Sequence, residues 1–157
     1  MSDKMTHIDA SGDANMVNIG DKINSFRKAR ARGEIRLKDS TIEDIEKDLV
    51  AKGSVLTVAR IGAIDAVKHT WEMIPLCHQI DINGIDVQFV IEKNKIIIEV
   101  EVETFGKTGC EMEAIMGVSV GLNVILDMVK SLEKDDNGQY PLTSIGRIEI
   151  VEKTKEN

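Results

Sequence analysis

Small and apolar residues alternate with charged ones in the stretch 28–37. One side of this stretch carries Ala29, Ala31, Gly33, Ile35 and Leu37. The opposite side carries Lys28, Arg30, Arg32, Glu34 and Arg36. A period of two predicts a half-buried strand. Its mostly basic side is compatible either with phosphate binding or with a solvent-exposed strand face.

Three later stretches have helical spacing. Ser40 to Glu43 matches a capping box, which predicts a short amphipathic helix that reaches Val50 and ends at Lys52-Gly53. A second helix is predicted from Ser54 towards Met73, stopped by Pro75. Its small residues would let it approach a neighbouring element closely. A third helix is predicted from about Cys110 to Leu132.

Further alternation predicts a hairpin, with strands around 85–91 and 98–102 joined by a turn at 93–95. A turn at 135–138 precedes a last strand that holds Ile148 and Ile150. The order strand, helices, hairpin, helix, strand predicts an α+β fold, a ferredoxin-like sandwich with helices packed on one face of an antiparallel sheet. We expect a single catalytic domain, 1–157, in which 1–20 form an irregular N-terminal arm.

The composition is that of a globular protein, with 42% hydrophobic and 30% charged residues in 157. No continuous apolar run is long enough to span a bilayer, and the N-terminus lacks the apolar core of a signal peptide. Two cysteines, Cys77 and Cys110, cannot form a disulfide framework. We therefore expect a cytoplasmic protein that does not bind a membrane.

The net charge of −7 argues against a protein that coats nucleic acid, which would normally be basic. It leaves room for a small anionic ligand, because such a pocket needs only a few local cations. A solvated acidic surface is the simpler explanation of the charge.

The segment Gly106-Lys107-Thr108-Gly109 resembles part of a phosphate-binding loop. The full motif needs a glycine at position 101, where this chain has Glu101, so the motif fails. A turn that leads into a helix start can still present backbone N–H groups to an anion. An ordinary glycine-rich turn explains the segment equally well.

The turn Pro75-Leu76-Cys77-His78 follows the second predicted helix. Adjacent side chains diverge, and the sequence has no metal-ligand spacing to supply further donors, so we expect no metal site and no cofactor. A loop histidine is commonly a surface residue, although imidazole can donate to a phosphate or a carbonyl.

The third predicted helix carries the most informative charges. Asp127 and Lys130 lie at i and i+3 on one face. They form either an exposed ion pair or a general acid/base unit. Glu113 lies two heptads before Asp127, about 21 Å away on an unbroken helix. One subunit could hardly bring both carboxylates to one reacting atom, which favours a site assembled from two chains.

A series of short segments follows in order along the chain, namely Thr6-His7-Ile8-Asp9, Met16-Val17-Asn18-Ile19, Lys52-Gly53, Ala59-Arg60-Ile61, Lys68-His69-Thr70-Trp71, Ile74-Pro75-Leu76-Cys77-His78, Gly106-Lys107-Thr108-Gly109, Glu111-Met112-Glu113-Ala114 and Asp127-Met128. These segments resemble the cyclic pyranopterin monophosphate synthase family, the molybdenum cofactor biosynthesis protein C family. They run across nearly the whole chain without large insertions, so their combination is specific.

The resemblance implies a lyase that converts 3′,8-cyclo-7,8-dihydroguanosine 5′-triphosphate to cyclic pyranopterin monophosphate and releases pyrophosphate. It assigns catalysis to Asp127, Lys52 and Lys130. It assigns substrate binding to a second set of residues, namely Leu76, Cys77, His78, Met112 and Glu113. It also implies a homo-oligomer, a hexamer of three dimers, with the site at the dimer interface.

These residue types suit the chemistry. Ring opening and pyran formation need repeated proton transfers, which we assign to Asp127. Departure of pyrophosphate calls for cations and N–H donors, which Lys52, Lys107, Lys130 and His78 would supply. The chain ends without the Gly- and Lys-rich tail common in the family, so a phosphate contact from such a tail is not expected. A non-catalytic nucleotide- or pterin-binding regulatory module is the alternative function.

Overall fold

Four antiparallel strands form one sheet. The computed structural model describes residue 8 and residues 11–156. The strands are β1 (Ser25–Arg36), β2 (Gly84–Glu92), β3 (Lys95–Gly106) and β4 (Ser144–Glu156), in the spatial order β2-β3-β1-β4. Each neighbouring pair is antiparallel, and the β2–β3 hairpin turns through Lys93 and Asn94. The hairpin is therefore confirmed.

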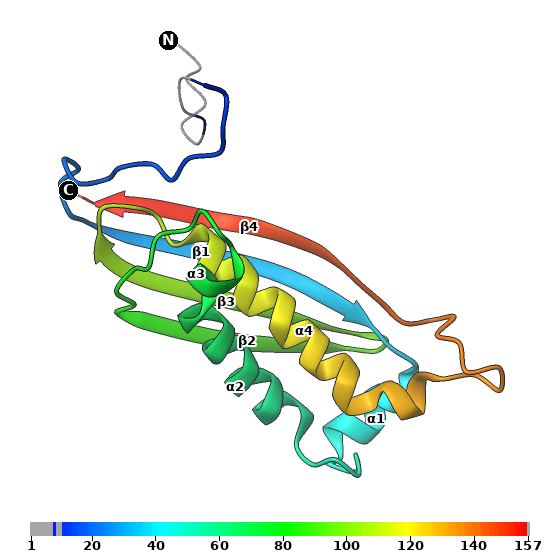
Figure 1. Cartoon of the computed structure of the whole chain (residues 1–157). Coiled ribbons are helices and arrows are strands. Elements are labelled where there is room, and N and C mark those ends of the chain that lie inside the picture. The colour runs from blue at the N-terminus through cyan, green and yellow to red at the C-terminus, as the bar shows by residue number, and fades with distance from the viewer. Residues whose placement is uncertain (1–7, 9–10, 157) are drawn as a thin grey trace.

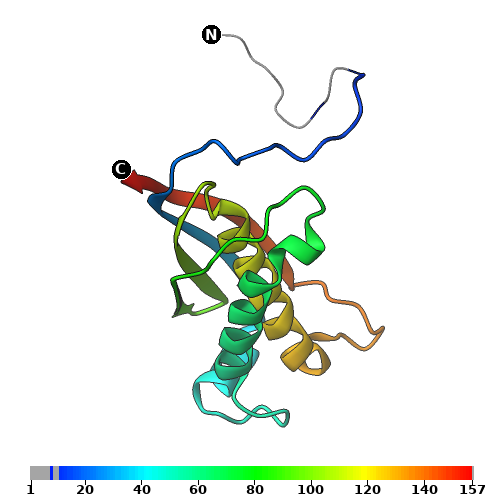
Figure 2. The same cartoon turned by 60° about the vertical axis from the view of Figure 1, so that its left-hand side comes forward.

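Four helices accompany the sheet. They are α1 (Asp39–Glu46), α2 (Val55–Lys68), α3 (Thr70–Met73) and α4 (Glu111–Glu133). The two long helices, α2 and α4, lie side by side on one face of the sheet, and α1 lies near the C-terminal end of α4 (Figures 1 and 2). This arrangement confirms the predicted α+β, ferredoxin-like fold with helices on one face.

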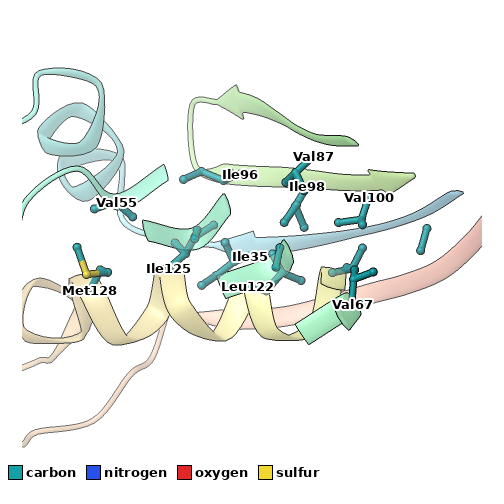
Figure 3. Close-up of a cluster of buried hydrophobic side chains, with 14 of the residues drawn as sticks. Ile35, Val55, Val67, Val87, Ile96, Ile98, Val100, Leu122, Ile125 and Met128 are labelled. Carbon is teal, nitrogen blue, oxygen red and sulfur yellow. The ribbon is translucent and has the colours of Figure 1, made fainter. Parts of the chain in front are cut away.

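The core lies between this helical layer and the sheet. Strand residues such as Ile35, Ile96 and Ile98 meet Leu122 and Ile125 of α4 there, and all five are fully buried (Figure 3). Their burial follows from the alternation in the strands and the helical spacing in α4. The core fixes α4 against the sheet, and α4 carries most of the candidate site.

The α2–α4 contact depends on glycine. A Cβ at Gly117 would lie 2.8 Å from Val67 Cγ2 and 2.9 Å from Val100 Cγ1. A Cβ at Gly121 would lie 2.5 Å from Ile98 Cδ1. The close approach expected for the second helix is confirmed, and glycines of α4 make it possible as much as the alanines of α2.

The opposite face of the sheet is charged. On β1, Lys28 pairs with Glu101 at 3.0 Å, and Arg30 pairs with Glu152 at 2.8 Å. Arg32 pairs in the same way with Glu149. Three of the four cations on this side of the strand are therefore neutralised by carboxylates of neighbouring strands, which favours a solvent-exposed strand face over a phosphate site.

Three strand predictions were too short. The strand predicted around 98–102 is β3, which already begins at Lys95 and ends at Gly106. The sequence placed the start of the first strand near Ala29, but β1 begins at Ser25. The last strand, identified from Ile148 and Ile150, runs over 13 residues. Register shifts in the β1–β4 pairing interrupt the alternation of β4, which explains why its full length escaped the pattern.

The first helix differs from its prediction at both ends. Its N-cap is Lys38 and no side chain caps it, so the capping box at Ser40 was wrong. The backbone N–H of Lys38 instead donates to the Glu133 carboxylate at 3.1 Å. The helix ends at Glu46, well before Val50, and Asp48 then adopts a left-handed φ of 55°.

The second predicted helix is two helices. α2 ends at Lys68, His69 takes a non-helical conformation, and α3 follows as a single turn. The His69 N–H is shared between the regular helical acceptor, the Asp65 carbonyl at 3.1 Å, and the Ala66 carbonyl at 3.2 Å. The Thr70 hydroxyl also donates to the Ala66 carbonyl, at 3.0 Å, so that side-chain and backbone donors meet at this oxygen where the regular ladder ends.

Within the described residues, α4 is the one helix long and apolar enough to cross a membrane by length and composition. Its sequence has no continuous apolar run, because Ser119, Asn123 and Asp127 interrupt it. Half of its apolar stretch is buried inside the fold, as expected for a core helix.

Of the predicted N-terminal arm, 1–7 and 9–10 lie outside the described residues. The remainder shows an isolated bridge between Ile8 and Ala14 and no helix or strand.

Candidate active site

Lys52, Asp127 and Lys130 form one cluster at the C-terminal end of α4. The loop between α1 and α2 brings Lys52 to this helix, where its Nζ donates to the Asp127 backbone carbonyl at 2.7 Å and to Oδ2 at 3.2 Å. Lys130 Nζ donates to the other carboxylate oxygen, Oδ1, at 2.7 Å. All three side chains are substantially exposed. The three residues assigned to catalysis are therefore neighbours.

This arrangement sets the charge of each group. The hydrogen bond from Lys130, followed by that from Lys52, lowers the pKa of Asp127 below its usual value. The hydrogen bond to Asp127 raises the pKa of Lys130. At neutral pH the cluster thus holds a carboxylate that can accept a proton, beside an ammonium group that keeps its own.

A pocket of about 300 Å³ brings together the five residues assigned to substrate binding. The turn after α3 contributes Leu76, Cys77 and His78, and the first turn of α4 contributes Met112 and Glu113. Residues that sequence reasoning did not assign complete the lining, namely Thr108, Gly109 and Glu111. The Gly106–Gly109 segment therefore contributes part of the wall.

Burial changes the acidity of two pocket residues. Glu113 is only 4% exposed, and burial raises its pKa to about 7, an effect partly opposed by a hydrogen bond from its own backbone N–H. The pKa of the Cys77 thiol is also raised, first by burial and then by the nearby Glu113 carboxylate. The pocket thus offers a carboxyl group that titrates near neutrality, and its thiol is not activated.

An ion pair that sequence reasoning missed organises the rim of this pocket. Lys153 of β4 contacts the Glu111 carboxylate. A Cβ at Gly109 would lie 1.9 Å from Glu111 Oε2, so a side chain at Gly109 would displace this carboxylate. A strand residue distant in sequence cannot be assigned to a helix terminus by spacing, and the pairing becomes visible only in the fold.

Lys107 does not join the Lys52–Asp127–Lys130 cluster. Its Nζ donates to the Gly20 carbonyl at 2.5 Å. Within one subunit, Lys107 therefore does not contact Asp127 as Lys52 and Lys130 do, and this contact gives no support to a shared charge-stabilising role.

The pocket and the Lys52–Asp127–Lys130 cluster lie at opposite ends of α4. Glu113 belongs to the first turn of this helix, whereas Asp127 lies fourteen positions later in an unbroken helix. At 1.5 Å per residue their backbones stand about 21 Å apart. Within one subunit, the members of each predicted set lie close to one another, but the substrate-binding set and the catalytic set lie far apart.

A family model described as the MoaC family matches residues 16–156. The chain belongs to the MoaC family. The match includes every residue of the pocket and of the cluster, and it confirms the resemblance noted in the sequence.

Relatives of the MoaC chain are similar over nearly their full lengths. A probable cyclic pyranopterin monophosphate synthase of Natronomonas pharaonis is 55% identical over 99% of this chain and 98% of the relative. A protein with the same description from Pyrococcus furiosus is 48% identical over 98% and 97%. A relative from Methanothermobacter thermautotrophicus, 49% identical over 97% and 95%, is described as a probable cyclic pyranopterin monophosphate synthase accessory protein.

Proposed function

We propose that this protein is a cyclic pyranopterin monophosphate synthase of molybdenum cofactor biosynthesis. It is a lyase that converts 3′,8-cyclo-7,8-dihydroguanosine 5′-triphosphate to cyclic pyranopterin monophosphate and releases pyrophosphate. Membership of the MoaC family and the descriptions of its full-length relatives support this function. We further propose that it acts in the cytoplasm.

The contact of Asp127 with Lys52 and Lys130 is the observation that carries the chemical assignment. The lowered pKa of Asp127 keeps the carboxylate ionised, so that it can accept protons as the ring opens and the pyran forms. The two ammonium groups stabilise negative charge as pyrophosphate leaves. This division assigns proton transfer to Asp127 and charge stabilisation to the lysines.

The pocket at the other end of α4 would hold the substrate through Leu76, Cys77, His78, Met112 and Glu113. Because the pKa of Glu113 is about 7, its carboxyl is close to half protonated at neutral pH. It can therefore donate a hydrogen bond to a ring carbonyl or accept one from a ring N–H.

A complete site on this proposal uses two subunits. The pocket of one chain lies against the Lys52–Asp127–Lys130 cluster of a second chain, and three such dimers form a hexamer. The separation of about 21 Å along α4 supports sharing, because the two groups of one chain cannot reach the same reacting atom. The exposure of the cluster leaves it available to a second subunit.

The proposal is tested by incubating the purified oligomer with the cyclised GTP intermediate and following pyrophosphate and the cyclic product. Asp127→Asn should lower turnover by about 10²- to 10⁴-fold, the usual contribution of general acid–base catalysis. Asp136→Asn, which changes an exposed carboxylate in the β4-proximal turn, is the matched control and should retain full turnover. Full turnover by folded Asp127→Asn would exclude its proton-transfer role. Binding of the intermediate without pyrophosphate release by the wild-type protein would favour the regulatory module.

A further inference from the structure

A buried carboxyl group lies at the last residue of α4. Glu133 is fully buried, and within the part of the chain that the structure describes Glu113 is the one other buried carboxyl side chain. Glu113 lines the pocket, whereas Glu133 lies at the opposite end of the helix and belongs neither to the pocket nor to the Lys52–Asp127–Lys130 cluster. Burying a carboxyl group is costly unless it is hydrogen-bonded, so its partners indicate what it does.

Hydrogen bonds join Glu133 to the start of α1 and to the residue before β4. The backbone N–H of Lys38 donates to Oε1 at 3.1 Å and to Oε2 at 3.3 Å. The Thr143 hydroxyl donates to Oε2 at 2.5 Å. Lys38 Nζ in turn donates to the Leu132 and Lys134 carbonyls at 2.8 and 3.1 Å, at the end of α4 where carbonyls have no partner within the helix. The end of α4 and the start of α1 therefore hold each other.

The segment 38–52, which begins at this contact, also brings Lys52 to Asp127. α1 starts directly after Lys38, and Lys52 follows its last residue, Glu46, by six positions. Lys52 Nζ donates to the Asp127 backbone carbonyl at 2.7 Å and to its Oδ2 at 3.2 Å. The segment thus contacts the end of α4 twice, at its last residue and about 9 Å earlier along the helix, with α1 beside it (Figure 1).

The chain between these two contacts is packed against the core. Ile42 and Ile45 of α1 are buried, and so is Val50 after the helix. A displacement at Lys38 is therefore transmitted along the segment to Lys52. The Lys52 side chain is itself exposed and long, so its position depends on where its backbone is held.

We propose that Glu133 is a positioning residue for the cluster at the C-terminal end of α4. By holding the start of α1 through the Lys38 N–H, it keeps Lys52 on Asp127. The effect on turnover rests on the proposed lyase function, whereas the placement of Lys52 is a property of the fold alone. A purely structural role for Glu133 predicts a loss of stability only, and a positioning role adds a loss of kcat that the loss of stability does not explain.

Turnover of the cyclised GTP intermediate by purified oligomers tests the proposal at a temperature where circular dichroism shows every variant to be folded. Glu133→Ala should lower kcat by about 10- to 100-fold, the effect of losing one hydrogen bond to a charged group, and change KM by less than about twofold. The KM is preserved because the pocket with Glu113 lies at the other end of α4. Glu133→Gln keeps an acceptor for the Lys38 N–H and should restore kcat to within about threefold of wild type.

Two further variants separate positioning from stability. Glu133→Met fills the same space without an acceptor, so it replaces Glu133→Ala if that variant does not fold, and it should lower kcat to the same extent. Val87→Ala opens a cavity at a buried residue of β2 that belongs to neither the pocket nor the cluster. It should lower the stability by a comparable amount and leave kcat unchanged.

Hydrogen exchange followed by mass spectrometry tests the placement of Lys52 without substrate. The backbone amides of 47–54 should exchange faster in Glu133→Ala and Glu133→Met than in wild type, because this segment opens locally once its anchor is lost. In Glu133→Gln and Val87→Ala, the same amides should exchange as in wild type.

The proposal is overturned if the folded alanine or methionine variant of Glu133 keeps wild-type kcat, or if Glu133→Gln is as slow as they are. It is also overturned if Val87→Ala loses as much kcat, or if the exchange of 47–54 is the same in every variant. A wild-type protein that releases no pyrophosphate would instead contradict the proposed lyase function. The exchange of 47–54 then decides by itself whether Glu133 holds the segment that carries Lys52.

Discussion

Replacing Glu113 by glutamine should remove a pH dependence of stability that arises from one buried carboxyl. Glu113 is 4% exposed, and burial is the main cause of its raised pKa. Glutamine has nearly the same size and shape but remains neutral at every pH. The substitution therefore changes the titration and largely preserves the packing at the start of α4.

The size of this effect on the unfolding free energy follows from the difference between the pKa of Glu113 in the folded chain and its pKa in the unfolded chain. Each pH unit between their pKa values is worth about 1.4 kcal/mol, so a rise from 4.5 to about 7 corresponds to about 3 kcal/mol per subunit. Between these values the folded chain binds more protons than the unfolded chain, and stability falls as the pH rises. The favourable contribution of the protonated carboxyl is complete below pH 4.5 and is lost above pH 7.

Urea unfolding at a fixed subunit concentration measures this effect. The unfolding free energy of Glu113→Gln minus that of wild type should increase by about 3 kcal/mol between pH 4.5 and pH 8. Glu46→Gln, at an exposed glutamate of α1, should show no comparable change. A difference that stays constant with pH, together with carboxylate infrared absorption from Glu113 already present at pH 5.5, would refute the reasoning.

Two further predictions concern packing and buried hydrogen bonds. Gly117→Ala should lower the unfolding free energy, measured by urea titration, by about 1–2 kcal/mol, because overpacking against Val67 and Val100 outweighs the better helix propensity of alanine. The control is Gly146→Ala, whose Cβ would have no neighbour within 4 Å and which should be nearly neutral in the same titration. Glu133→Ala should cost about 3 kcal/mol, because it leaves the Lys38 N–H and the Thr143 hydroxyl without their acceptor. Equal melting temperatures for Glu133→Ala and the exposed-site control Glu46→Ala would contradict this second prediction.

The fold could be predicted because its main elements carry a clear period. Alternation identified β2 and β3, and helical spacing identified α4 to within a residue at each end. The ends of the helices were mispredicted where a side chain forms a hydrogen bond with the backbone, either nearby in the sequence or far from it. The Thr70 hydroxyl bonds the Ala66 carbonyl at the break between α2 and α3, and the Glu133 carboxylate accepts the N–H of Lys38 at the start of α1. No periodic pattern reveals either contact.

The structure brings the residues assigned to the site together in two groups, whose surroundings the sequence did not indicate. The family resemblance supplied both sets of residues, and helix geometry correctly placed Glu113 and Asp127 far apart. The sequence did not indicate that Glu113 is buried while Asp127 is exposed, since both belong to one face by spacing alone. The Lys153–Glu111 pair joins β4 to α4 and depends on the sheet order.

The shared site is tested most directly by mixing two inactive variants. His78→Ala removes a pocket residue and Asp127→Asn removes the acid/base residue, so each homo-oligomer should release little pyrophosphate. If each site combines the pocket of one chain with the cluster of another, equal co-expression should restore about one quarter of wild-type turnover by random assortment of subunits. Turnover of the mixed oligomers no higher than that of the separate variants would contradict a site built from two chains.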